Sequence, residues 1–251
     1  MTKTNIAIIG ASGGIGSAFV RLLSQNKNNT VYAFARSTPP SIKNSLTDNS
    51  ILNDSETTIR SHIDYSDEES IRIAAELTVQ SGPLDLVIVA TGFLHDHTIM
   101  PEKSLRELSQ ISFQKNFLIN TIGPALVAKH FLPKLHKDQR SVFTVLSARV
   151  GSISDNRLGG WYAYRASKAA VNMFIKTASI EAARKQKNAI IVGLHPGTVA
   201  SPLSQPFQKN VAPEKLFTPE YAAKKLINVI QNLEIKDSGN IFAWDGKTIA
   251  S

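Results

Sequence analysis

Cysteine is absent from all 251 residues of this chain. A protein without thiols cannot form disulfides, use a thiolate nucleophile, or hold zinc or an iron–sulfur cluster through sulfur. The chain also lacks any run of about 18 apolar residues, so we expect no membrane-spanning helix. The apolar stretch that ends at Ile9 is short and is followed by glycines, which argues against a secretory signal. These absences predict a cytoplasmic protein in a reducing compartment.

No internal repeat and no low-complexity linker divides the chain, and 42% of its residues are hydrophobic. This length and composition favour a single domain that covers residues 1–251. The net charge of +8 raises the alternative of a nucleic-acid partner. The basic residues are scattered, however, and none forms a run with interleaved aromatics. We therefore expect neither a nucleic-acid nor a membrane partner, and the positive charge would instead attract a phosphorylated small molecule.

Short apolar, β-branched runs alternate along the chain with longer segments of helical period, which predicts parallel βαβ units. The expected strands are 5–9, 30–35, 84–90, 141–146, 189–194 and 240–243, and the expected helices are 15–23, 67–80, 113–135, 162–184 and 219–233. Asp67 and Thr218 are expected N-caps. The polar segment 37–61 is expected to be a loop with at most a short helix. The pattern predicts an α/β, doubly wound Rossmann fold whose seven-stranded sheet is mostly or wholly parallel.

A glycine-rich segment follows the first expected strand and opens the first expected helix. It contains Gly10, Ser12, Gly13, Gly14, Ile15 and Gly16. Glycines at this point allow a tight turn, close approach of the backbone to a pyrophosphate, and packing of helix on strand. The N–H groups of the helix N-terminus are free to bind the anion. This context predicts a dinucleotide-binding turn, with a purely structural turn as the alternative.

Arg36 and Ser37 follow the second expected strand, where the ribose of the adenosine should lie. An Asp or Glu at this place would bind the 2′-hydroxyl of NAD and repel a phosphate. A guanidinium can pair with the 2′-phosphate of NADP instead. The sequence therefore favours NADP(H) over NAD(H), and the alternative is a solvated arginine at a strand end.

Tyr164 and Lys168 stand four residues apart near the start of a long expected helix, so they share one face. A tyrosine has a reference pKa of about 10 and needs a nearby positive charge to act as an acid or base at neutral pH. Lys168 could supply that charge. The spacing alone is weak evidence, because Tyr221 and Lys225 repeat it on a later expected helix, where we expect a surface pair.

The order of these motifs resembles the short-chain dehydrogenase/reductase family, in which the glycine turn and a Tyr-x-x-x-Lys helix form one site. Residues 151–170 are further similar to the branch of bacterial C-factor and small carbonyl reductases, and the resemblance covers essentially the whole chain. It implies an NADP-dependent oxidoreductase that transfers hydride between nicotinamide and a carbonyl or alcohol. It also implies a homodimer or tetramer that pairs through the helices 113–135 and 162–184.

The resemblance assigns roles to further positions. Asp64 matches an acid that meets the adenine ring, and its alternative role is a helix cap. Asn120 matches a catalytic helix asparagine that anchors a proton-relay water near the lysine, with a kink at Gly123 and Pro124 as the alternative. The remaining cofactor contacts are implied for Ala90, Thr91, Gly92, Pro196, Gly197, Val199 and Ser201. Ala90 replaces the asparagine that braces this turn in the family.

The family's catalytic serine falls on Ala148 in this chain, and Ser147 is one residue early. Because side chains alternate faces along a strand, Ser147 should point away from a substrate. Either the backbone deviates there, Ser152 or Ser154 substitutes, or Tyr164 holds the substrate oxygen alone. Loss of one donor to a developing oxyanion costs about a hundredfold in rate. An NADP-binding signalling or regulatory protein with little turnover is therefore the rival hypothesis.

The segment 202–213 combines prolines with polar residues and predicts a mobile substrate lid at about 199–215. His95, Asp96 and His97 are more typical of a loop at the cleft rim than of a metal site, because no third ligand can be named. His195 is expected to pack at a strand end rather than act as a base. The rim and the lid carry no recognisable specificity chemistry, so the sequence does not name the substrate.

Overall fold

A computed structural model describes residues 3–36, 52–55 and 57–250 of the chain. The strands of its main sheet are β1 (Thr4–Ile9), β2 (Asn29–Ala35), β3 (Leu52–Ser55), β4 (Thr58–His62), β5 (Leu86–Val89), β6 (Ser141–Leu146), β7 (Ala189–His195), β10 (Ile241–Ala243) and β11 (Thr248–Ile249). They lie in the order β11-β10-β7-β6-β5-β1-β2-β4-β3. Within the described residues the sheet has nine strands rather than the expected seven. The seven strands from β10 to β4 are parallel, and the short strands β11 and β3 add an antiparallel strand at each edge.

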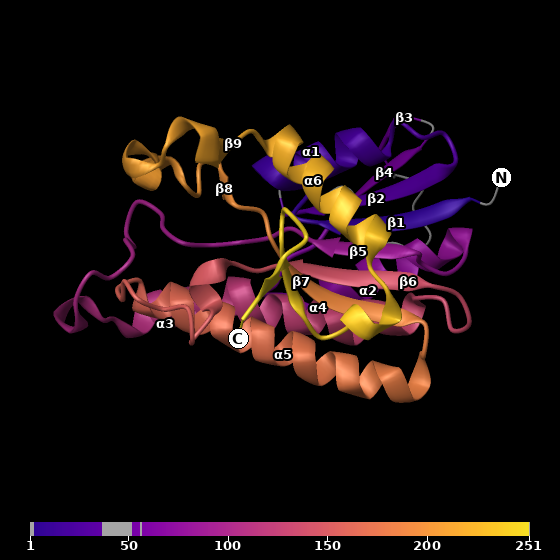
Figure 1. The fold of residues 1–251 in the computed structure, drawn as a ribbon. Coiled ribbons are helices and arrows are strands. Elements are labelled where there is room, and N and C mark those ends of the chain that lie inside the picture. The colour runs from indigo at the N-terminus through magenta and orange to yellow at the C-terminus, as the bar shows by residue number, and fades with distance from the viewer. Residues whose placement is uncertain (1–2, 37–51, 56, 251) are drawn as a thin grey trace.

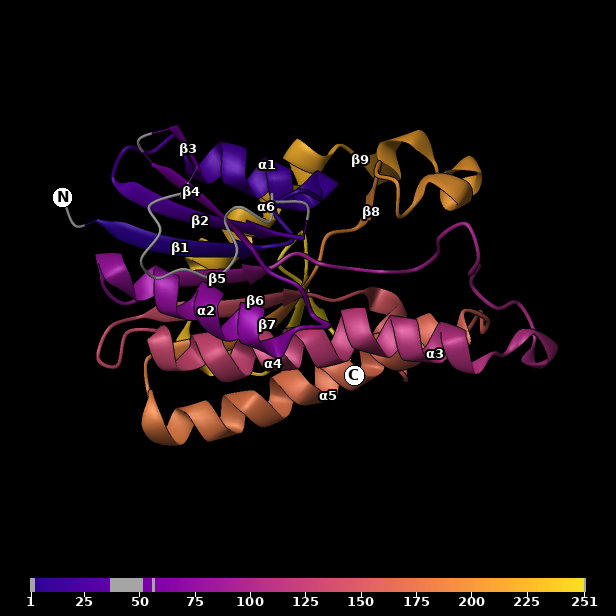
Figure 2. The ribbon, with the colours of Figure 1, turned by 180° about the vertical axis from the view of Figure 1, so that it is seen from behind.

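Helices cover both faces of the sheet. They are α1 (Gly14–Leu23), α2 (Glu68–Thr78), α3 (Gln110–Phe117), α4 (Gly123–Phe131), α5 (Tyr162–Lys185) and α6 (Pro219–Asn232). Figures 1 and 2 show α1 and α6 on one face, with α2, α4 and α5 on the other. Each face carries its own apolar core, in which residues such as Phe19 and Leu226 pack on one side and Phe131 and Ile175 on the other. In the described parts of the chain, no helix has the length and apolar character that crossing a bilayer requires.

The doubly wound α/β fold and all six expected apolar strands are confirmed, with boundaries within two residues. The loop predicted for 37–61 is wrong for its described part, because β3 and β4 lie there. Residues 37–51 lie outside the described residues. β4 contains polar residues such as Thr58 and Ser61 and has no continuous apolar run. It is held as a strand by backbone pairing with β2 on one side and β3 on the other, which hydropathy does not record.

The expected helix 113–135 is built from α3 and α4, which are joined by a π-helical turn at Leu118–Ile122. In this turn the N–H of Gly123 bonds to the carbonyl of Leu118, one residue beyond α-helical spacing. Pro124 follows and has no N–H, so the ordinary donor to the Asn120 carbonyl is missing. The irregularity predicted at Gly123 and Pro124 is therefore present, and Asn120 lies within it.

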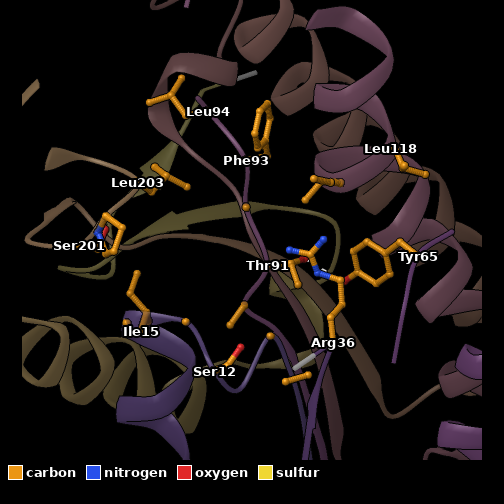
Figure 3. A pocket seen from close by; sticks show the side chains of 18 of the residues that line it. Ser12, Ile15, Arg36, Tyr65, Thr91, Phe93, Leu94, Leu118, Ser201 and Leu203 are labelled. Atoms are coloured by element: carbon orange, nitrogen blue, oxygen red, sulfur yellow. Dashed lines mark hydrogen bonds between the residues drawn. The ribbon is translucent and has the colours of Figure 1, made fainter. Parts of the chain in front are cut away.

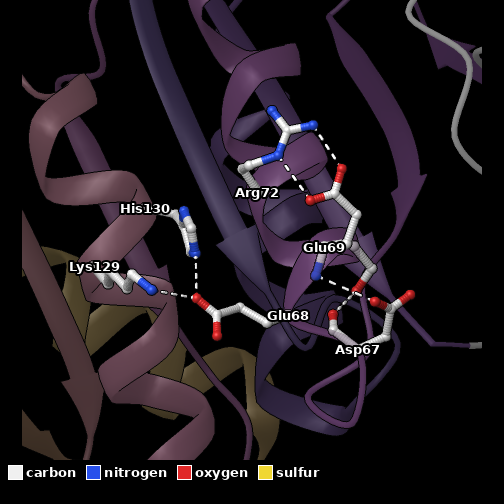
Figure 4. Close-up of polar contacts among 7 residues, drawn as sticks. Asp67, Glu68, Glu69, Arg72, Lys129 and His130 are labelled. Carbon is white, nitrogen blue, oxygen red and sulfur yellow. Dashed lines mark hydrogen bonds and ion pairs between the residues drawn. The ribbon is translucent and has the colours of Figure 1, made fainter.

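The N-terminus of α2 is fixed by its own acidic residues, as Figure 4 shows. Asp67 caps the helix as predicted, because its carboxylate accepts the N–H of Glu69 at 3.1 Å. The Glu68 carboxylate forms hydrogen bonds with two side chains of α4, those of Lys129 at 2.6 Å and His130 at 2.9 Å. These exposed pairs add little stability individually, but they join α2 to α4 at the end that approaches the cleft. Thr218 likewise caps α6, as predicted.

Candidate functional site

Two adjoining cavities lie at the carboxyl ends of the parallel strands, where ligands bind in open α/β sheets. Their volumes are about 630 Å³ and about 620 Å³. The linings share Ile15, Ala90, Thr91, Gly92, Leu94, Ser201 and Leu203, so the cavities form one continuous cleft. We call the half beside Gly10 and Arg36 the dinucleotide cavity and the half beside Tyr164 the substrate cavity.

The glycine-rich turn forms one wall of the dinucleotide cavity. Gly10 has a φ of +87°, which favours glycine, and its carbonyl accepts the N–H of Gly13 at 3.0 Å. A Cβ on Gly16 would lie 2.1 Å from the Gly10 oxygen, so Gly16 serves the packing of α1 on the turn. The N-cap of α1 is Gly13, which has no side chain to cap the helix, and this leaves N–H groups for an anion. Ser12, Gly13, Gly14 and Ile15 line the cavity, and this open cradle fits a pyrophosphate.

Arg36 and Asp64 line the far end of the dinucleotide cavity. The Asp64 carboxylate accepts the N–H and hydroxyl of Ser66 at 2.9 and 2.8 Å. Burial would raise the pKa of Asp64, but these hydrogen bonds and the charge of Arg36 lower it overall. The alternative role of Asp64 as the cap of α2 is wrong, because Asp67 takes that place. Ser37 lies outside the described residues.

Tyr65 is a member of the dinucleotide cavity that the sequence reading missed. Figure 3 shows it beside Arg36 and Thr91, and its hydroxyl lies 2.9 Å from the Thr91 hydroxyl. A Cβ on Gly123 would come within 1.9 Å of the Tyr65 ring, so only glycine leaves room for it. The Tyr65–Thr91 contact braces the turn in which Ala90 replaces the family's asparagine. No sequence pattern predicts this contact, because it forms only when three segments that are distant in sequence come together.

Tyr164 and Lys168 lie on the first turns of α5 and line the substrate cavity. Both are buried, at 8% and 3% exposure. The ammonium of Lys168 donates to the Leu146 carbonyl at 2.8 Å and lies 5.8 Å from the centre of the Tyr164 ring. Burial lowers the pKa of Lys168 to about 8. Burial also raises the pKa of Tyr164, opposite to the expected lowering, so the phenol keeps its proton at neutral pH.

The other Tyr–Lys pair differs in its surroundings. Tyr221 is 41% exposed, and the ammonium of Lys225 lies 5.5 Å from the centre of its ring. Neither residue lines the two cavities. The same spacing therefore gives a surface pair here, as expected.

Glu102 fixes the start of α5 and was also missed from the sequence. Trp161, the residue before the helix, has a left-handed φ of 53° and offers no side-chain cap. Glu102 is 2% exposed and accepts the N–H of Ala163 at 3.2 Å through its carboxylate. The same carboxylate accepts the Ser112 hydroxyl, and the Glu102 carbonyl accepts the Trp161 N–H. Glu102, in the loop 94–104 at the rim of the cleft, therefore caps the helix that carries Tyr164.

Asn120 is fully buried, and its side chain joins three segments. Its Oδ1 accepts the N–H of Phe93 at 2.9 Å, and its Nδ2 donates to the Phe93 carbonyl at 2.8 Å. Nδ2 also donates to the hydroxyl of Ser167, next to Lys168, at 3.0 Å. The side chain thus ties the segment after β5 to α5, while the backbone carbonyl lacks its usual helical donor.

Ala148 occupies the place expected for a catalytic serine, since it packs with Tyr164 and Leu94 in the wall of the substrate cavity. Ser147 also lines the cavity, but its hydroxyl donates to Asn172 of α5 at 2.5 Å and is engaged there. Ser152 is buried and accepts the N–H of Asp155, and neither it nor Ser154 lines the cavity. Of the alternatives, the geometry favours a substrate oxygen held by Tyr164 without a serine.

The segment that follows β7 covers the substrate cavity. Its backbone begins with Pro196 and Gly197, which line the cavity together with Val199 and Ser201. Two short strands, β8 (Thr198–Val199) and β9 (Leu216–Phe217), pair in parallel and hold the two ends of the segment together. Between them the chain forms 3-10 turns at Gln205–Asn210 and Pro213–Lys215, where an irregular lid was expected.

The rim histidine His95 contacts this covering segment. Its Nε2 lies 3.1 Å from the carbonyls of Pro202 and Leu203, and its ring packs against Phe207. Asp96 pairs with Lys115 of α3. Among the residues that the structure describes, no cluster of three or more His, Asp or Glu could hold a metal ion.

His195 ends β7, and its buried Nδ1 has no hydrogen-bond partner among the residues that the structure describes. Burial, together with the nearby charge of Arg149, lowers the pKa of His195 to about 4. The imidazole is therefore neutral at pH 7, in keeping with a packed strand-end residue.

Comparison with known proteins relates this fold and cleft to a family. Residues 4–212 match the family model described as short chain dehydrogenase. The chain is 28% identical to the 1-hydroxy-2-glutathionyl-2-methyl-3-butene dehydrogenase of Rhodococcus sp. (strain AD45), over 97% of both chains. It is 29% identical to the C-signal of Myxococcus xanthus, over 68% of this chain and 95% of that protein.

Among solved structures, an NADPH-bound carbonyl reductase from chicken fatty liver superposes with a TM-score of 0.81 at 24% identity, covering 100% of this chain and 96% of the other. This likeness supports the fold. The matched family model, which spans the glycine turn and the Tyr164–Lys168 helix, decides the identity. The chain belongs to the short chain dehydrogenase family of oxidoreductases.

Proposed function

We propose that this protein is an NADP(H)-dependent carbonyl reductase, which transfers hydride between nicotinamide and a carbonyl or alcohol substrate. The observation that carries the proposal is the continuity of the cleft, because the glycine turn and the Tyr164–Lys168 pair line adjoining cavities. The chicken protein, described as an NADPH-bound carbonyl reductase, and the Rhodococcus relative, named a dehydrogenase, support the same chemistry.

The preference for NADP(H) rests on Arg36. It follows β2, lines the dinucleotide cavity and is exposed, so its guanidinium is accessible to a 2′-phosphate. The neighbouring Ala35 offers no carboxylate that would bind the hydroxyl of NAD instead. Asp64, at the same end of the cavity, is proposed to meet the adenine.

The site residues then divide the chemistry. When bound, the nicotinamide supplies the hydride that reduces a carbonyl carbon, or accepts it in the reverse direction. Tyr164, protonated in its buried site, donates the proton from Oη to the substrate oxygen, which completes the alcohol. The charge of Lys168 stabilises the phenolate left behind and holds the ribose hydroxyls. The Asn120 carbonyl is proposed to bind a water that returns a proton through Lys168.

The test is NADPH oxidation against a panel of aldehydes, ketones and quinones. Tyr164→Phe should lower kcat at least a hundredfold without loss of NADPH binding, because only the proton donor is removed. Ala148→Ser should raise kcat, because it restores a donor to the substrate oxygen. Tight NADPH binding with no turnover on any substrate would instead favour a signalling or regulatory protein.

A further inference from the structure

The loop between β6 and α5, together with the first turns of α5, brings three arginines to the substrate cavity. Arg149, Arg157 and Arg165 line it together with Lys168. Among the described residues of this lining, Asp155 is the one carboxylate. Lys168 belongs to the catalytic pair, so the three arginines need a separate explanation.

The three arginines differ in how their charge is compensated. Arg149 pairs with Asp155 at 3.0 Å. Arg165 donates to the carbonyls of Gly160 at 2.9 Å and of Val150 at 3.3 Å, and these bonds orient its guanidinium without neutralising it. Arg157 is exposed, and within the described parts of the chain it has no ion pair or hydrogen bond. Two positive charges at the cavity therefore lack a carboxylate partner.

The phosphates of a dinucleotide do not account for these charges. The glycine turn follows β1, whereas the arginines follow β6, and β5 lies between these two strands. Neighbouring strands are about 4.8 Å apart, which separates the two strand ends by about 10 Å. The arginines therefore belong to the substrate half of the cleft.

The rest of the substrate cavity is apolar. Trp161 and Phe207 pack against each other with ring centres 4.9 Å apart, and Leu94 and Leu203 extend the same wall. A molecule that fits here would place an apolar or aromatic body against these rings and an anionic group toward Arg157 and Arg165.

We propose that the carbonyl substrate carries a carboxylate or a similar anionic group, and that Arg157, supported by Arg165, binds it. This inference rests on the proposed function and names the substrate class of that same site. Arg157 is the better residue to substitute, because it has no ion pair or hydrogen bond to lose among the described residues. Arg165, in α5, donates to backbone carbonyls of the preceding loop, so its substitution would also disturb that loop.

The experiment compares 4-formylbenzoate with its methyl ester as substrates for NADPH-dependent reduction. In the wild type, kcat/KM should be higher for the acid, and added salt should reduce this advantage by screening. Arg157→Gln should raise KM for the acid about tenfold and leave the ester unchanged, because one charge-assisted contact is lost. The matched control Arg184→Gln removes the same charge at the far end of α5 and should change neither substrate. Equal kcat/KM for acid and ester, unaffected by Arg157→Gln, overturns the inference.

Binding separates this inference from the proposed function. Benzoate and methyl benzoate are titrated calorimetrically into the protein saturated with NADP⁺. Benzoate should bind more tightly, and Arg157→Gln should weaken it about tenfold. If neither these aldehydes nor any substrate of the panel is reduced but this binding pattern holds, the reductase proposal fails and the anion site stands. If benzoate binds no better than its ester, the anion site fails even when both aldehydes are reduced.

Discussion

Lys168 is a buried ammonium that pairs with no carboxylate among the described residues. Its hydrogen bond to the Leu146 carbonyl compensates only part of the lost hydration, and its pKa falls from 10.5 to about 8. Between these two pKa values the unfolded chain binds more protons than the folded chain, so the free energy of unfolding rises with pH across that window. Below about pH 8 the folded chain holds the buried charge, and the full cost of burying it applies. Lys168 therefore carries its positive charge at a cost in stability.

Lys168→Met tests this cost, because the variant has a similar volume and no titrating group. From pH 8 to 10.5, the wild type should gain about 3 kcal/mol of unfolding free energy relative to the variant. Urea unfolding of both proteins at several pH values measures the difference, which also cancels the titration of surface lysines. A difference that stays constant over this range would contradict the buried charge.

At the scale of one residue, the proposed preference for NADP(H) rests on Arg36, which lines the dinucleotide cavity. Arg36→Gln should raise KM for NADPH about tenfold, because it removes a charge-assisted bond to the 2′-phosphate, and should leave KM for NADH unchanged. Initial-rate kinetics with both cofactors measures this. Arg184→Gln serves as the matched control for lost charge. Equal losses with NADPH and NADH would assign Arg36 a structural role.

At the scale of elements, α5 depends on a cap from outside its own sequence neighbourhood. Its preceding residue, Trp161, has no capping side chain, and Glu102 bonds to the helix N-terminus across 61 positions of sequence. The first turn of α5 carries Tyr164 toward the cavity, so the cap positions the proposed proton donor relative to Ala148 and Leu94.

Substitution of Glu102 should separate this positioning role from simple packing. Glu102→Ala should destabilise the protein by about 3 kcal/mol, because it leaves the Ala163 N–H and the Ser112 hydroxyl unpaired in a buried place. Glu102→Gln keeps an acceptor oxygen and should restore most of the stability and of kcat. Glu107→Ala, an exposed substitution on the same rim, is the control. Chemical unfolding and kcat measured together check the prediction, and a Gln variant as poor as Ala would refute the cap.

At the scale of the whole molecule, the cleft crosses the carboxyl ends of strands from both halves of the sheet. It draws on β1 and β2 at one end and on β6 and β7 at the other. A ligand that bridges these strands binds only the folded chain, so its binding free energy adds to stability.

NADPH should therefore stabilise the protein globally. At one hundred times its Kd it should add about 2.7 kcal/mol to the unfolding free energy, and NADH at the same concentration should add less. Thermal unfolding with each cofactor measures this without any turnover. Equal shifts for the two cofactors would contradict the proposed preference for NADP(H).

The sequence by itself determined the fold class, the six apolar strands, the glycine turn and the Tyr164–Lys168 pair. These features follow from local periodicity and spacing, which can be recognised without knowing which distant segments come into contact.

Only the tertiary structure decided the remaining features. β4 is a strand because it pairs with its neighbours in the sheet. The Tyr65 hydroxyl contacts that of Thr91, and the Tyr65 ring packs on Gly123. The Glu102 carboxylate accepts a hydrogen bond from the start of α5. The pKa of Tyr164 is raised rather than lowered because of burial, which is a property of the whole fold. Burial and long-range contact depend on which distant segments meet, and no local pattern records that.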